Sequence, residues 1–489
     1  SSYYVILQKY VLIFQGILNS IEEWSSIYGD IFGYFHGFRP IMVIRDPELI
    51  KQIFIRNFDS FPKRQQIQEA SGVVPVNTVK LSRISGDKWR LIRALTSPAF
   101  KSNKLRQAFP IIEECTEEFL KIMEKDKWAQ ERGGIDINPA FCRLSLEILL
   151  RFTMGARLNV QAASKETEVI VNAARNAARR FPLGWVMICN LIPMWDSIKK
   201  VIIFVQERLR EAPTVIFHKH LFELVRQRRA KGWTGTEDLF QLLFNAEEKY
   251  GPNRKPDGTT HFTGKGHSEN SDTTRTGRTI TAFETAANVE VFVIAGLETV
   301  SSALSFTAHL LAKHQDVQEK VRAEVKLLLE KDGSITYDNI SKLQYLSQVI
   351  SESLRVYPPL PGQVNRKCVK DFAFDGFRIP KETQIQVPVR LMHHDPRYWV
   401  DPEEFNPDRF SPENKKTIEP AAYMPFGIGL RICPAARFAE MALALLFSKI
   451  VANFKLQLSD QPDKRTIEYA SPVSLAFPDG GAWVWMEKI

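Results

Sequence analysis

Cysteine is scarce in this 489-residue sequence, and its distribution excludes two structural roles. The five cysteines lie far apart, form no CxxC pair and are odd in number. This pattern argues against a disulfide framework and a structural zinc site, and a reducing compartment fits it best. The chain also lacks a GxxxxGK loop, an HExxH motif and a complete dinucleotide-binding loop. It therefore carries no flavin or nicotinamide motif of its own.

The positive charge of the chain comes without a signature of nucleic-acid binding. Lys and Arg outnumber Asp and Glu by 65 to 56, a net charge of +9. No RNP-type aromatic motif and no helix made mainly of Lys and Arg occurs, so we expect no nucleic-acid partner. Anionic lipid and an acidic protein remain as partners for a basic surface.

Two apolar stretches of the sequence are candidates for a membrane span, and neither fits. Residues 3–15 are interrupted by Gln8 and Lys9, so this stretch is too short and too polar to cross a bilayer, which needs about 20 apolar residues. It also lacks the cleavage site of a signal peptide. Residues 285–314 are long and apolar, but Glu290 and Glu298 would be costly in hydrocarbon. We predict a buried core helix there, and we expect a membrane anchor to be absent from this chain.

Apolar residues at three- and four-residue intervals predict that most of the chain is helical. Short runs bounded by Gly, Pro or charged residues predict a minority of strand. Residues 251–278 contain almost no large apolar side chain and are interpreted as a mobile surface loop. We predict one mainly α domain over residues 1–489, with small β-sheets at the N-terminal side and near the C-terminus. The predicted helices cover residues 105–125, 138–152, 201–229, 285–314 and 338–357, and the predicted strands cover residues 31–35, 41–45, 372–379 and 384–389.

The middle of the predicted core helix carries the run Ala295-Gly296-Leu297-Glu298-Thr299. Two small residues permit a flat cofactor to approach the backbone closely. An acid beside a hydroxyl can pass protons to a group bound there. A packed helix with one buried hydrogen-bonded pair is an equally good interpretation of these residues alone.

Glu352 and Arg355 are three residues apart and therefore lie on one face of a helix that Pro358 ends. Such a pair is weak evidence by itself, because exposed helical pairs contribute only a few tenths of a kcal/mol. Arg409, in an irregular segment broken by proline, is a candidate third member of a Glu-Arg-Arg cluster. An ordinary turn arginine is the alternative.

One cysteine stands in the segment Phe426-Gly-Ile-Gly-Leu-Arg-Ile-Cys433. Its glycines permit positive φ and a close approach to a ring, and Arg431 places a cation just ahead of the cysteine. Pro434 suits the first position of a helix predicted over residues 435–454. A thiolate at a helix N-terminus is favoured by the dipole and is a strong axial donor to haem iron. A buried structural cysteine is the alternative.

Further cations suit the anionic groups of such a cofactor. Trp89 and Arg93 lie four residues apart on one predicted helical face, an arrangement that grips a carboxylate. Arg366 opens a strand-like region and is a third candidate beside Arg431. Taken singly, each of these arginines is more often a solvated surface residue.

The run His393-His394-Asp395 contains residue types that bind metals. Neighbouring histidines on an extended backbone point to opposite faces, however. We therefore predict a structural role for both histidines.

In this order the pieces resemble the cytochrome P-450 family of haem-thiolate monooxygenases over nearly the whole chain. The motifs WxxxR, AGxET, ExxR, PxRF and FGxGxRxC occur at family-like spacing. One such motif arises by chance, but five in order do not. The resemblance implies a cytochrome P-450 fold that holds haem b, iron protoporphyrin IX, between the 285–314 helix and the helix after Cys433. It also implies that dioxygen is a co-substrate.

The resemblance further implies a role for each matching residue. Cys433 is expected to be the axial ligand of the iron, and Glu298 and Thr299 are expected to deliver protons during cleavage of dioxygen. Haem contacts are expected from Trp89, Arg93, Ala295, Gly296, Arg366, Phe426, Gly427, Arg431, Cys433 and Ala435. A structural cluster is expected from Glu352, Arg355 and Arg409.

Within the family, the wording AGLETVSS and the polar loop before it look most like the animal microsomal branch that metabolises xenobiotics. Such a member lies on the cytoplasmic face of the endoplasmic reticulum membrane and receives electrons from NADPH through a separate cytochrome P-450 reductase or a cytochrome b-type donor. Residues 180–195 fall where family members dip a hydrophobic loop into the membrane surface, and core packing is an equally good interpretation. An acidic docking partner is expected near Lys88, Arg90, Lys101, Lys104 and Arg437.

The expected substrates are lipophilic small molecules of xenobiotic, sterol or fatty-acid type. By resemblance, residues 61–79, 291–299, 360–364 and 472–475 line the pocket. The cysteine segment departs from the family pattern at Leu430, where proline is common, and at Ala435, where glycine is common. Pro434 also cannot donate an N–H to the sulfur. We therefore expect that haem affinity or redox potential differs from that of members with the usual family pattern.

Two alternative functions remain at this point. One is a haem-thiolate isomerase or dehydratase that acts on a peroxide without dioxygen, against which the presence of both Glu298 and Thr299 argues. The other is a haem-binding or haem-sensing protein, or a membrane-associated scaffold, without turnover. The changes at Leu430 and Ala435 keep this second alternative open.

Overall fold

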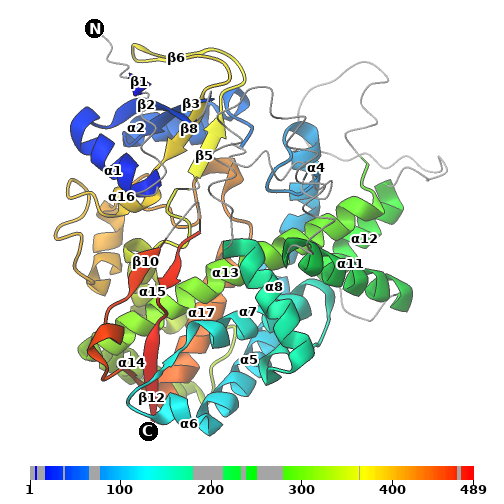
Figure 1. The fold of residues 1–489 in the computed structure, drawn as a ribbon, viewed down its shortest axis with the longest axis vertical. Coiled ribbons are helices and arrows are strands. Elements are labelled where there is room, and N and C mark those ends of the chain that lie inside the picture. The colour runs from blue at the N-terminus through cyan, green and yellow to red at the C-terminus, as the bar shows by residue number, and fades with distance from the viewer. Residues whose placement is uncertain are drawn as a thin grey trace.

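A body of helices makes up most of the molecule (Figure 1). The computed structural model describes residues 6–7, 17–36, 39–64, 78–179, 213–232, 238–250, 279–362, 364–470 and 475–489. The helices there are α1 (Ile17–Tyr28), α2 (Pro47–Lys51), α4 (Gly86–Thr96), α5 (Ser102–Lys125), α6 (Lys127–Gln130), α7 (Asn138–Met154), α8 (Lys165–Arg179), α11 (Pro213–Lys231), α12 (Leu239–Tyr250), α13 (Ala282–Lys313), α14 (Gln315–Asp332), α15 (Gln344–Val356), α16 (Val389–His393) and α17 (Ala436–Asn453).

Helix α13 runs through the middle of this body and packs against α7 (Figure 1). It begins with a capping box, in which the Thr281 hydroxyl accepts the N–H of Glu284 and the Glu284 carboxylate accepts the N–H of Thr281. Buried side chains occur on every face of the helix, as expected for a helix in the core of a large protein. Among the described residues, α13 is the one helix long and apolar enough to cross a membrane, and most of its apolar window is buried inside the molecule. The predicted core helix is therefore confirmed.

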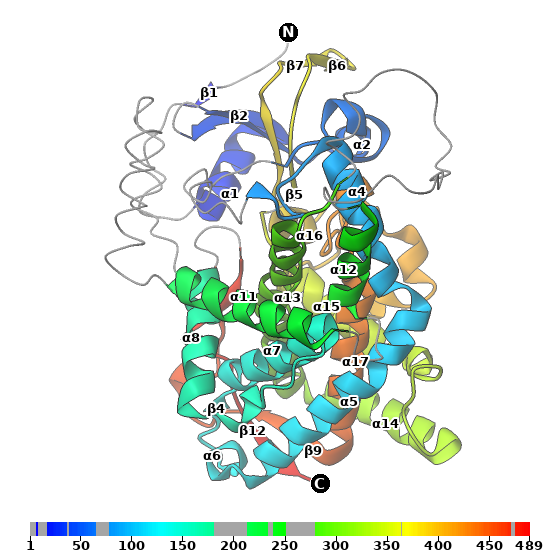
Figure 2. The same cartoon turned by 90° about the vertical axis from the view of Figure 1, so that its right-hand side faces the viewer.

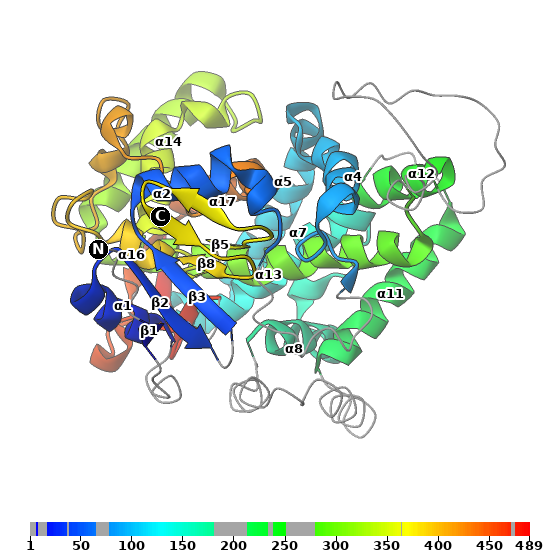
Figure 3. The same cartoon turned by 90° about the horizontal axis from the view of Figure 1, so that it is seen from above.

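A five-stranded sheet forms the N-terminal side, in the order β1-β2-β3-β8-β5 (Figure 3). Strands β2 and β3 are antiparallel neighbours, and β3 pairs in parallel with β8, where Ile41 lies opposite Gln384. Segments near residues 40 and 385 therefore lie side by side, and β5 at the sheet edge reaches the site described below. The strands are β1 (Ile6–Leu7), β2 (Ile31–His36), β3 (Arg39–Ile44), β5 (Val364–Lys367) and β8 (Gln384–Val387).

Smaller sheets complete the fold. A three-stranded sheet lies at the end of the molecule where the C-terminus is found (Figure 2), in the order β4-β12-β9. Two further pairs, β6-β7 and β10-β11, are antiparallel. The bounds are β4 (Ile135–Asp136), β6 (Phe372–Phe374), β7 (Phe377–Ile379), β9 (Phe454–Leu458), β10 (Glu468–Ala470), β11 (Phe477–Asp479) and β12 (Trp483–Lys488). The predicted fold class, mainly α with small sheets near both ends, is confirmed.

Several predicted elements differ from the structure. The strand predicted over residues 372–379 is the hairpin β6-β7, because Asp375 and Gly376 both adopt positive φ and form its turn. The helix predicted from residue 338 begins at Gln344, after a short 3-10 turn at residues 340–342. The helix predicted after the cysteine begins at Ala436, so Pro434 is not its first residue.

Other predictions fall on residues outside the described part of the chain. These are the loop at 251–278, the membrane-facing segment at 180–195, most of the apolar stretch at 3–15, the first part of the helix predicted at 201–229, and parts of the pocket ranges 61–79 and 472–475.

Candidate functional site

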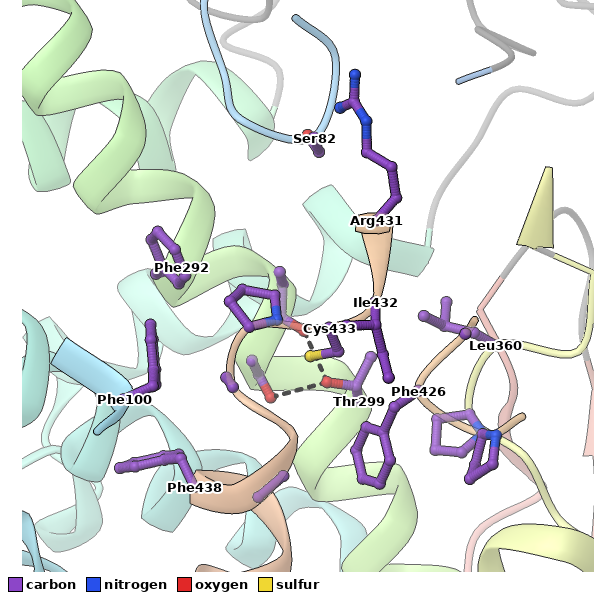
Figure 4. Close-up of a pocket in the computed structure, with 18 of the residues that line it drawn as sticks. Ser82, Phe100, Phe292, Thr299, Leu360, Phe426, Arg431, Ile432, Cys433 and Phe438 are labelled. Carbon is purple, nitrogen blue, oxygen red and sulfur yellow. Dashed lines mark hydrogen bonds between the residues drawn. The ribbon is translucent and has the colours of Figure 1, made fainter. Parts of the chain in front are cut away.

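A large apolar cavity lies between the middle of α13 and the segment that contains Cys433 (Figure 4). The space around it that no atom fills amounts to about 1650 Å³, counting the part open to solvent. Phe100, Phe292 and Phe438 form part of its wall. The cavity is therefore an apolar site of the kind that suits a flat, largely apolar cofactor.

Nearly all the predicted site residues line this cavity. From the haem-contact set they are Trp89, Arg93, Ala295, Gly296, Arg366, Phe426, Gly427, Arg431, Cys433 and Ala435, and from the catalytic pair Thr299. Of the predicted pocket ranges, the described lining residues are Arg64, Val291, Phe292, Ala295, Gly296, Thr299, Leu360 and Val364. Residues far apart in the sequence are thus brought together as predicted.

The Cys433 side chain faces the cavity from the end of a tight loop. The Cys433 N–H donates to the Phe426 carbonyl at 2.9 Å, which closes the loop, and Gly427 adopts a φ of 80° within it. Burial raises the pKa of the Cys433 thiol, while an N–H from Ala435 and the charges of Arg93 and Arg64 act in the opposite direction. The backbone N–H of Ala435, the residue after Pro434, therefore favours the thiolate form of Cys433.

The second glycine of the loop has a different partner from the one predicted. Gly429 has a φ of 73°, and a Cβ built on it would lie 2.0 Å from the carbonyl oxygen of Phe54. Gly429 is therefore needed where the loop crosses the π-helical turn at residues 52–56, rather than where it approaches a ring. For Gly427 the nearest such contact is 3.8 Å away, at Val364, so only its positive φ favours glycine.

The middle of α13 forms the opposite wall. Ala295 is exposed in the middle of an otherwise buried helix because it faces the cavity. The Thr299 hydroxyl also faces the cavity and donates to the Ala295 carbonyl at 2.7 Å (Figure 4). Gly296 lines the cavity, but a Cβ on it would lie 2.7 Å from the Leu149 side chain on α7. The small size of Gly296 therefore serves helix packing, whereas that of Ala295 leaves room in the cavity.

Glu298 is separated from the rest of the predicted site. Its side chain is 1% exposed, and it is not among the residues that line the cavity. The carbonyl of Glu298 accepts a hydrogen bond from Ser301 one turn later. The structure thus places Thr299 at the cavity and Glu298 on the buried side of α13.

Four arginines converge on one side of the cavity: Arg64, Arg93, Arg366 and Arg431. Burial lowers the pKa of all four, and for Arg64, Arg366 and Arg431 the charges of neighbouring arginines lower it further. The pKa of Arg431 falls to about 9. Among the described residues, no carboxylate forms an ion pair with any of them, and the buried Nε atoms of three of them, Arg64, Arg366 and Arg431, find no hydrogen-bond partner. This positive cluster fits an anionic ligand.

The hydrogen bonds that these arginines do make go to backbone carbonyls. Arg431 donates to Pro62 at 2.8 Å and Ile84 at 2.9 Å, and its guanidinium lies 4.1 Å from the centre of the Trp89 ring. Arg64 donates to the Arg431 carbonyl at 2.7 Å. Carbonyl bonds hold each guanidinium in place but do not neutralise its charge, so the fit to an anionic cofactor such as haem is good.

Arg64 falls in the pocket range 61–79 predicted from the sequence, but it was not predicted as a cation of the cofactor site. It lies in the run Phe61-Pro62-Lys63-Arg64, which matches no motif of the resemblance. Only its position in space, bonded to the Arg431 backbone and facing the cavity, reveals its membership in the cluster.

The Glu-Arg-Arg cluster forms as predicted, on the side of α15 away from solvent. Arg355 is fully buried and donates to both carboxylate oxygens of Glu352, at 2.7 and 2.8 Å. Arg409 donates to the same carboxylate at 3.2 Å. Arg355 also donates to the carbonyls of Pro402 and Glu404, at 2.7 and 3.0 Å. The ion pair thereby clamps the irregular segment after α16 onto α15.

The two neighbouring histidines both bond to another helix, and the backbone conformation predicted for them was wrong. They lie at the end of the short helix α16 rather than on extended backbone. Both rings reach the C-terminal turn of α15: His393 contacts the Arg355 carbonyl at 3.1 Å, and His394 contacts the Val356 carbonyl at 3.0 Å. Within the described residues, no group of three or more His, Cys, Asp or Glu is arranged to hold a metal ion.

A buried charged contact holds the edge of the cavity. Glu290 on α13 is 1% exposed and lies 3.1 Å from the ammonium of Lys80, and it also contacts His218 on α11. One residue on, the N–H of Leu81 donates to Asn288 at 2.8 Å. Because Leu81 lines the cavity, these bonds fix one part of its wall.

The cations expected at a docking surface are not all available there. Arg90, Lys101 and Arg437 are exposed, and Lys104 is partly exposed. The ammonium of Lys88, in contrast, lies 2.7 Å from Glu284 at the start of α13 and also contacts the carbonyl of Thr279. Lys88 therefore holds α4 against α13, which corrects its expected role.

Comparison with known proteins identifies the same pattern over almost the whole chain. The family model described as Cytochrome P450 matches residues 3–482. The chain is 30% identical over 450 residues to Cytochrome P450 3A41 of Mus musculus and to Cytochrome P450 3A2 of Rattus norvegicus, covering 91% of this chain and 82% of each relative. It is also 30% identical over 446 residues to Cytochrome P450 3A6 of Oryctolagus cuniculus, with the same coverage. These relatives agree with the resemblance to an animal branch.

Proposed function

The chain belongs to the cytochrome P450 family of haem-thiolate monooxygenases, and we propose that its cavity binds haem b with the Cys433 sulfur as axial ligand of the iron. As a member of this family it is an oxidoreductase that uses haem and dioxygen, receives electrons from a redox partner and acts on a lipophilic small molecule. The observation that carries the proposal is the meeting of one cysteine with four arginines for which the described part of the chain offers no carboxylate partner. Helices and β5 both contribute to this cavity, which supports one domain over residues 1–489.

The cation cluster would hold the cofactor by its anionic edge. Haem b carries a pair of propionates, and charge-assisted bonds to Arg64, Arg93, Arg366 and Arg431 would satisfy the nitrogens that lack partners. Trp89 supports this edge through the ring on which Arg431 lies. The apolar part of the haem would face Ala295, Gly296, Phe426, Gly427 and Ala435.

Bound haem would supply the activation of dioxygen, so that one oxygen atom enters the substrate and the other leaves as water. The chain contributes Thr299, whose hydroxyl proton is already donated to the Ala295 carbonyl. The oxygen of Thr299 therefore presents lone pairs to the cavity and can accept a hydrogen bond from a water that carries the proton to be delivered. In this proposal Glu298, on the buried side of α13, supports the proton delivery by Thr299 without lining the cavity.

Electrons would come from NADPH through a separate cytochrome P-450 reductase, or from a cytochrome b-type donor. A surface beside the cysteine loop suits such a partner, because Ile55 and Leu430 are exposed by 48% and 58%. Exposed Lys101 and Arg437 would add positive charge for an acidic partner. We place the protein on the cytoplasmic face of the endoplasmic reticulum membrane, with xenobiotics, sterols or fatty acids as substrates, on the resemblance to the microsomal branch.

The decisive experiment on haem ligation is the carbon monoxide difference spectrum of the reduced protein. The unmutated protein should show the red-shifted Soret band of thiolate ligation, and Cys433→Ser should lose it. Cys368→Ser is the matched control, because Cys368 is buried and donates to the Lys370 carbonyl away from the cavity. Absence of the band from the unmutated protein would exclude Cys433 as a thiolate ligand.

A second experiment separates a monooxygenase from an isomerase or a haem protein without turnover. NADPH consumption with added reductase should depend on substrate and yield oxygenated product. Thr299→Ala should consume NADPH with less product formed per NADPH, because water is no longer held at the cavity wall. Equal product per NADPH in both proteins would count against this role of Thr299.

A further inference from the structure

The imidazole of His393 connects helix α15, at Arg355, with the segment that leads to Cys433, at Met424. It is fully buried at the end of α16. One ring nitrogen, Nδ1, lies 3.1 Å from the Arg355 carbonyl oxygen, and the other, Nε2, lies 3.0 Å from the backbone nitrogen of Met424. Arg355 belongs to the Glu-Arg-Arg cluster, and Met424 begins the segment that leads to Cys433.

These partners determine the state of the ring. A carbonyl oxygen can only accept and a backbone N–H can only donate, so Nδ1 must carry the proton and Nε2 must be bare. Burial lowers the pKa of His393 to about 3, and the ring therefore stays neutral at physiological pH. Both of its hydrogen-bonding positions are used, which few other side chains could reproduce with the same rigidity.

A short series of hydrogen bonds runs from this ring to the cysteine. Arg355 donates from its guanidinium to the His393 carbonyl at 2.8 Å, so the contact with α15 is double. On the other side of the ring, Met424 is followed after one residue by Phe426, whose carbonyl accepts the N–H of Cys433 at 2.9 Å. The neighbouring Tyr423 stacks on the His393 ring, with 5.4 Å between ring centres, and donates to the Ser351 carbonyl at 3.0 Å.

We propose that His393 is a positioning residue for the Cys433 thiolate, in that it sets the distance between α15 and the entrance of the cysteine loop. Met424 is 2% exposed, so loss of the ring would leave its N–H buried without an acceptor. Such a loss typically shifts an equilibrium by about tenfold or more. The segment Met424–Phe426 would move to find another partner, and the Cys433 backbone bonded to Phe426 would move with it.

His394 provides a matched control inside the same element. It contacts the Val356 carbonyl at 3.0 Å and the Glu403 carboxylate at 2.8 Å. It is thus bonded to the same turn of α15, but both of its ring partners lie outside the cysteine loop. A general weakening of the α15–α16 contact should therefore follow from changing either histidine, whereas a change at the cysteine should follow only from changing His393.

The test compares the haem-loaded His393→Leu, His393→Gln and His394→Leu proteins with the unmutated chain. The first measurement is the ratio of the thiolate-type band to the band of a lost or protonated thiolate in the carbon monoxide difference spectrum, read together with the thermal midpoint. We expect this ratio to fall about tenfold in His393→Leu, to recover largely in His393→Gln, which keeps one donor and one acceptor, and to stay unchanged in His394→Leu. The second measurement is amide hydrogen exchange in the peptide around Met424, which should accelerate only in His393→Leu.

The outcomes distinguish this inference from the function on which it rests. If the unmutated protein lacks the thiolate-type band, the proposed ligation by Cys433 fails. If that band is present and His393→Leu keeps the unmutated ratio, or His394→Leu loses it equally at the same thermal midpoint, the positioning role of His393 fails alone. If His393→Leu does not fold, the His393→Gln protein decides. An unmutated ratio of the two carbon monoxide bands together with slow amide exchange around Met424 supports the positioning role. An unmutated ratio together with fast amide exchange refutes it, because the cysteine would then not depend on the bond to Met424.

Discussion

Among the described residues the cluster of Arg64, Arg93, Arg366 and Arg431 has no carboxylate partner. Removing one of these charges should therefore stabilise the haem-free protein but weaken its binding of haem. Arg366 is 2% exposed, and within the described residues its side chain donates to the carbonyls of Asn365 at 2.7 Å and Ile428 at 3.4 Å and to no other group. Burial and the charges of Arg64 and Arg431 hold its pKa well below the ordinary value. Its charge is therefore a cost to the folded chain until an anion arrives.

The size of this cost follows from general values. Replacing a buried ion pair by well-packed apolar residues of similar volume often stabilises a protein by about 1–4 kcal/mol, and we take the same range for removal of the Arg366 charge. The unfolding entropy of about 2.1 cal/mol/K per residue, taken over 489 residues, is about 1 kcal/mol/K. Arg366→Met should therefore raise the thermal midpoint of the haem-free protein by about 1–4 °C. In the loaded protein it removes a charge-assisted bond of about 1.5–3 kcal/mol, so haem should bind about 10- to 150-fold more weakly.

The assay measures the thermal midpoint of the haem-free chain by circular dichroism, and haem affinity from the rate of haem transfer to excess apomyoglobin. The control is Arg397→Met. Arg397 is 46% exposed and is paired with Asp30 and Asp395, so its loss should lower the midpoint with and without haem and leave haem transfer unchanged. A midpoint that falls in haem-free Arg366→Met as it does in Arg397→Met would refute the idea of an uncompensated charge.

Three further predictions concern residues around the cavity. In the haem-free chain, Gly429→Ala should lower the thermal midpoint far more than Gly427→Ala, because only at Gly429 would the new Cβ overlap a carbonyl, at 2.0 Å. Equal losses would show that positive φ alone matters. Glu290→Gln leaves the buried Lys80 ammonium without its carboxylate. This change should raise the dissociation constants of pocket ligands in spectral titrations, and unchanged dissociation constants would contradict the prediction. Arg355→Met removes the charge that is bonded to both oxygens of the buried Glu352 carboxylate, and we expect it to cost about 3–5 kcal/mol of unfolding free energy in denaturant titrations. A cost below about 1 kcal/mol, typical of an exposed pair, would contradict the burial.

The helices could be predicted where apolar periodicity continues for several turns. Helices α5 and α7 begin and end within three residues of the predicted bounds. The hairpin at residues 372–379 was not separated into two strands, although Asp375-Gly376 is a turn signal in the sequence itself. Strand β4 has two residues and β9 follows α17 without a break, so neither offers a pattern long enough to detect.

The members of the site could be predicted better than their contacts. The motifs indicated which residues meet at the cavity, because each motif carries its own residue types and spacing. What Gly296 and Gly429 touch depends on Leu149 and Phe54, which lie far away in the sequence and share no pattern with them. Arg64 belongs to no motif, and the separation of Glu298 from Thr299 depends on how α13 is turned against α7. These contacts are determined by tertiary packing, which the local sequence pattern does not reveal.

The two departures from the family pattern in the cysteine loop differ in what they can affect. Leu430 is 58% exposed and does not line the cavity, so its side chain cannot touch a bound haem and acts on the surface where an electron donor would bind. Ala435 lines the cavity, and its backbone N–H lowers the pKa of the Cys433 thiol. The residue that adds a methyl beside the proposed haem therefore also stabilises negative charge on the sulfur, which Pro434 cannot do because it has no N–H. Changes in redox potential should therefore follow from position 435, and changes in electron transfer from position 430.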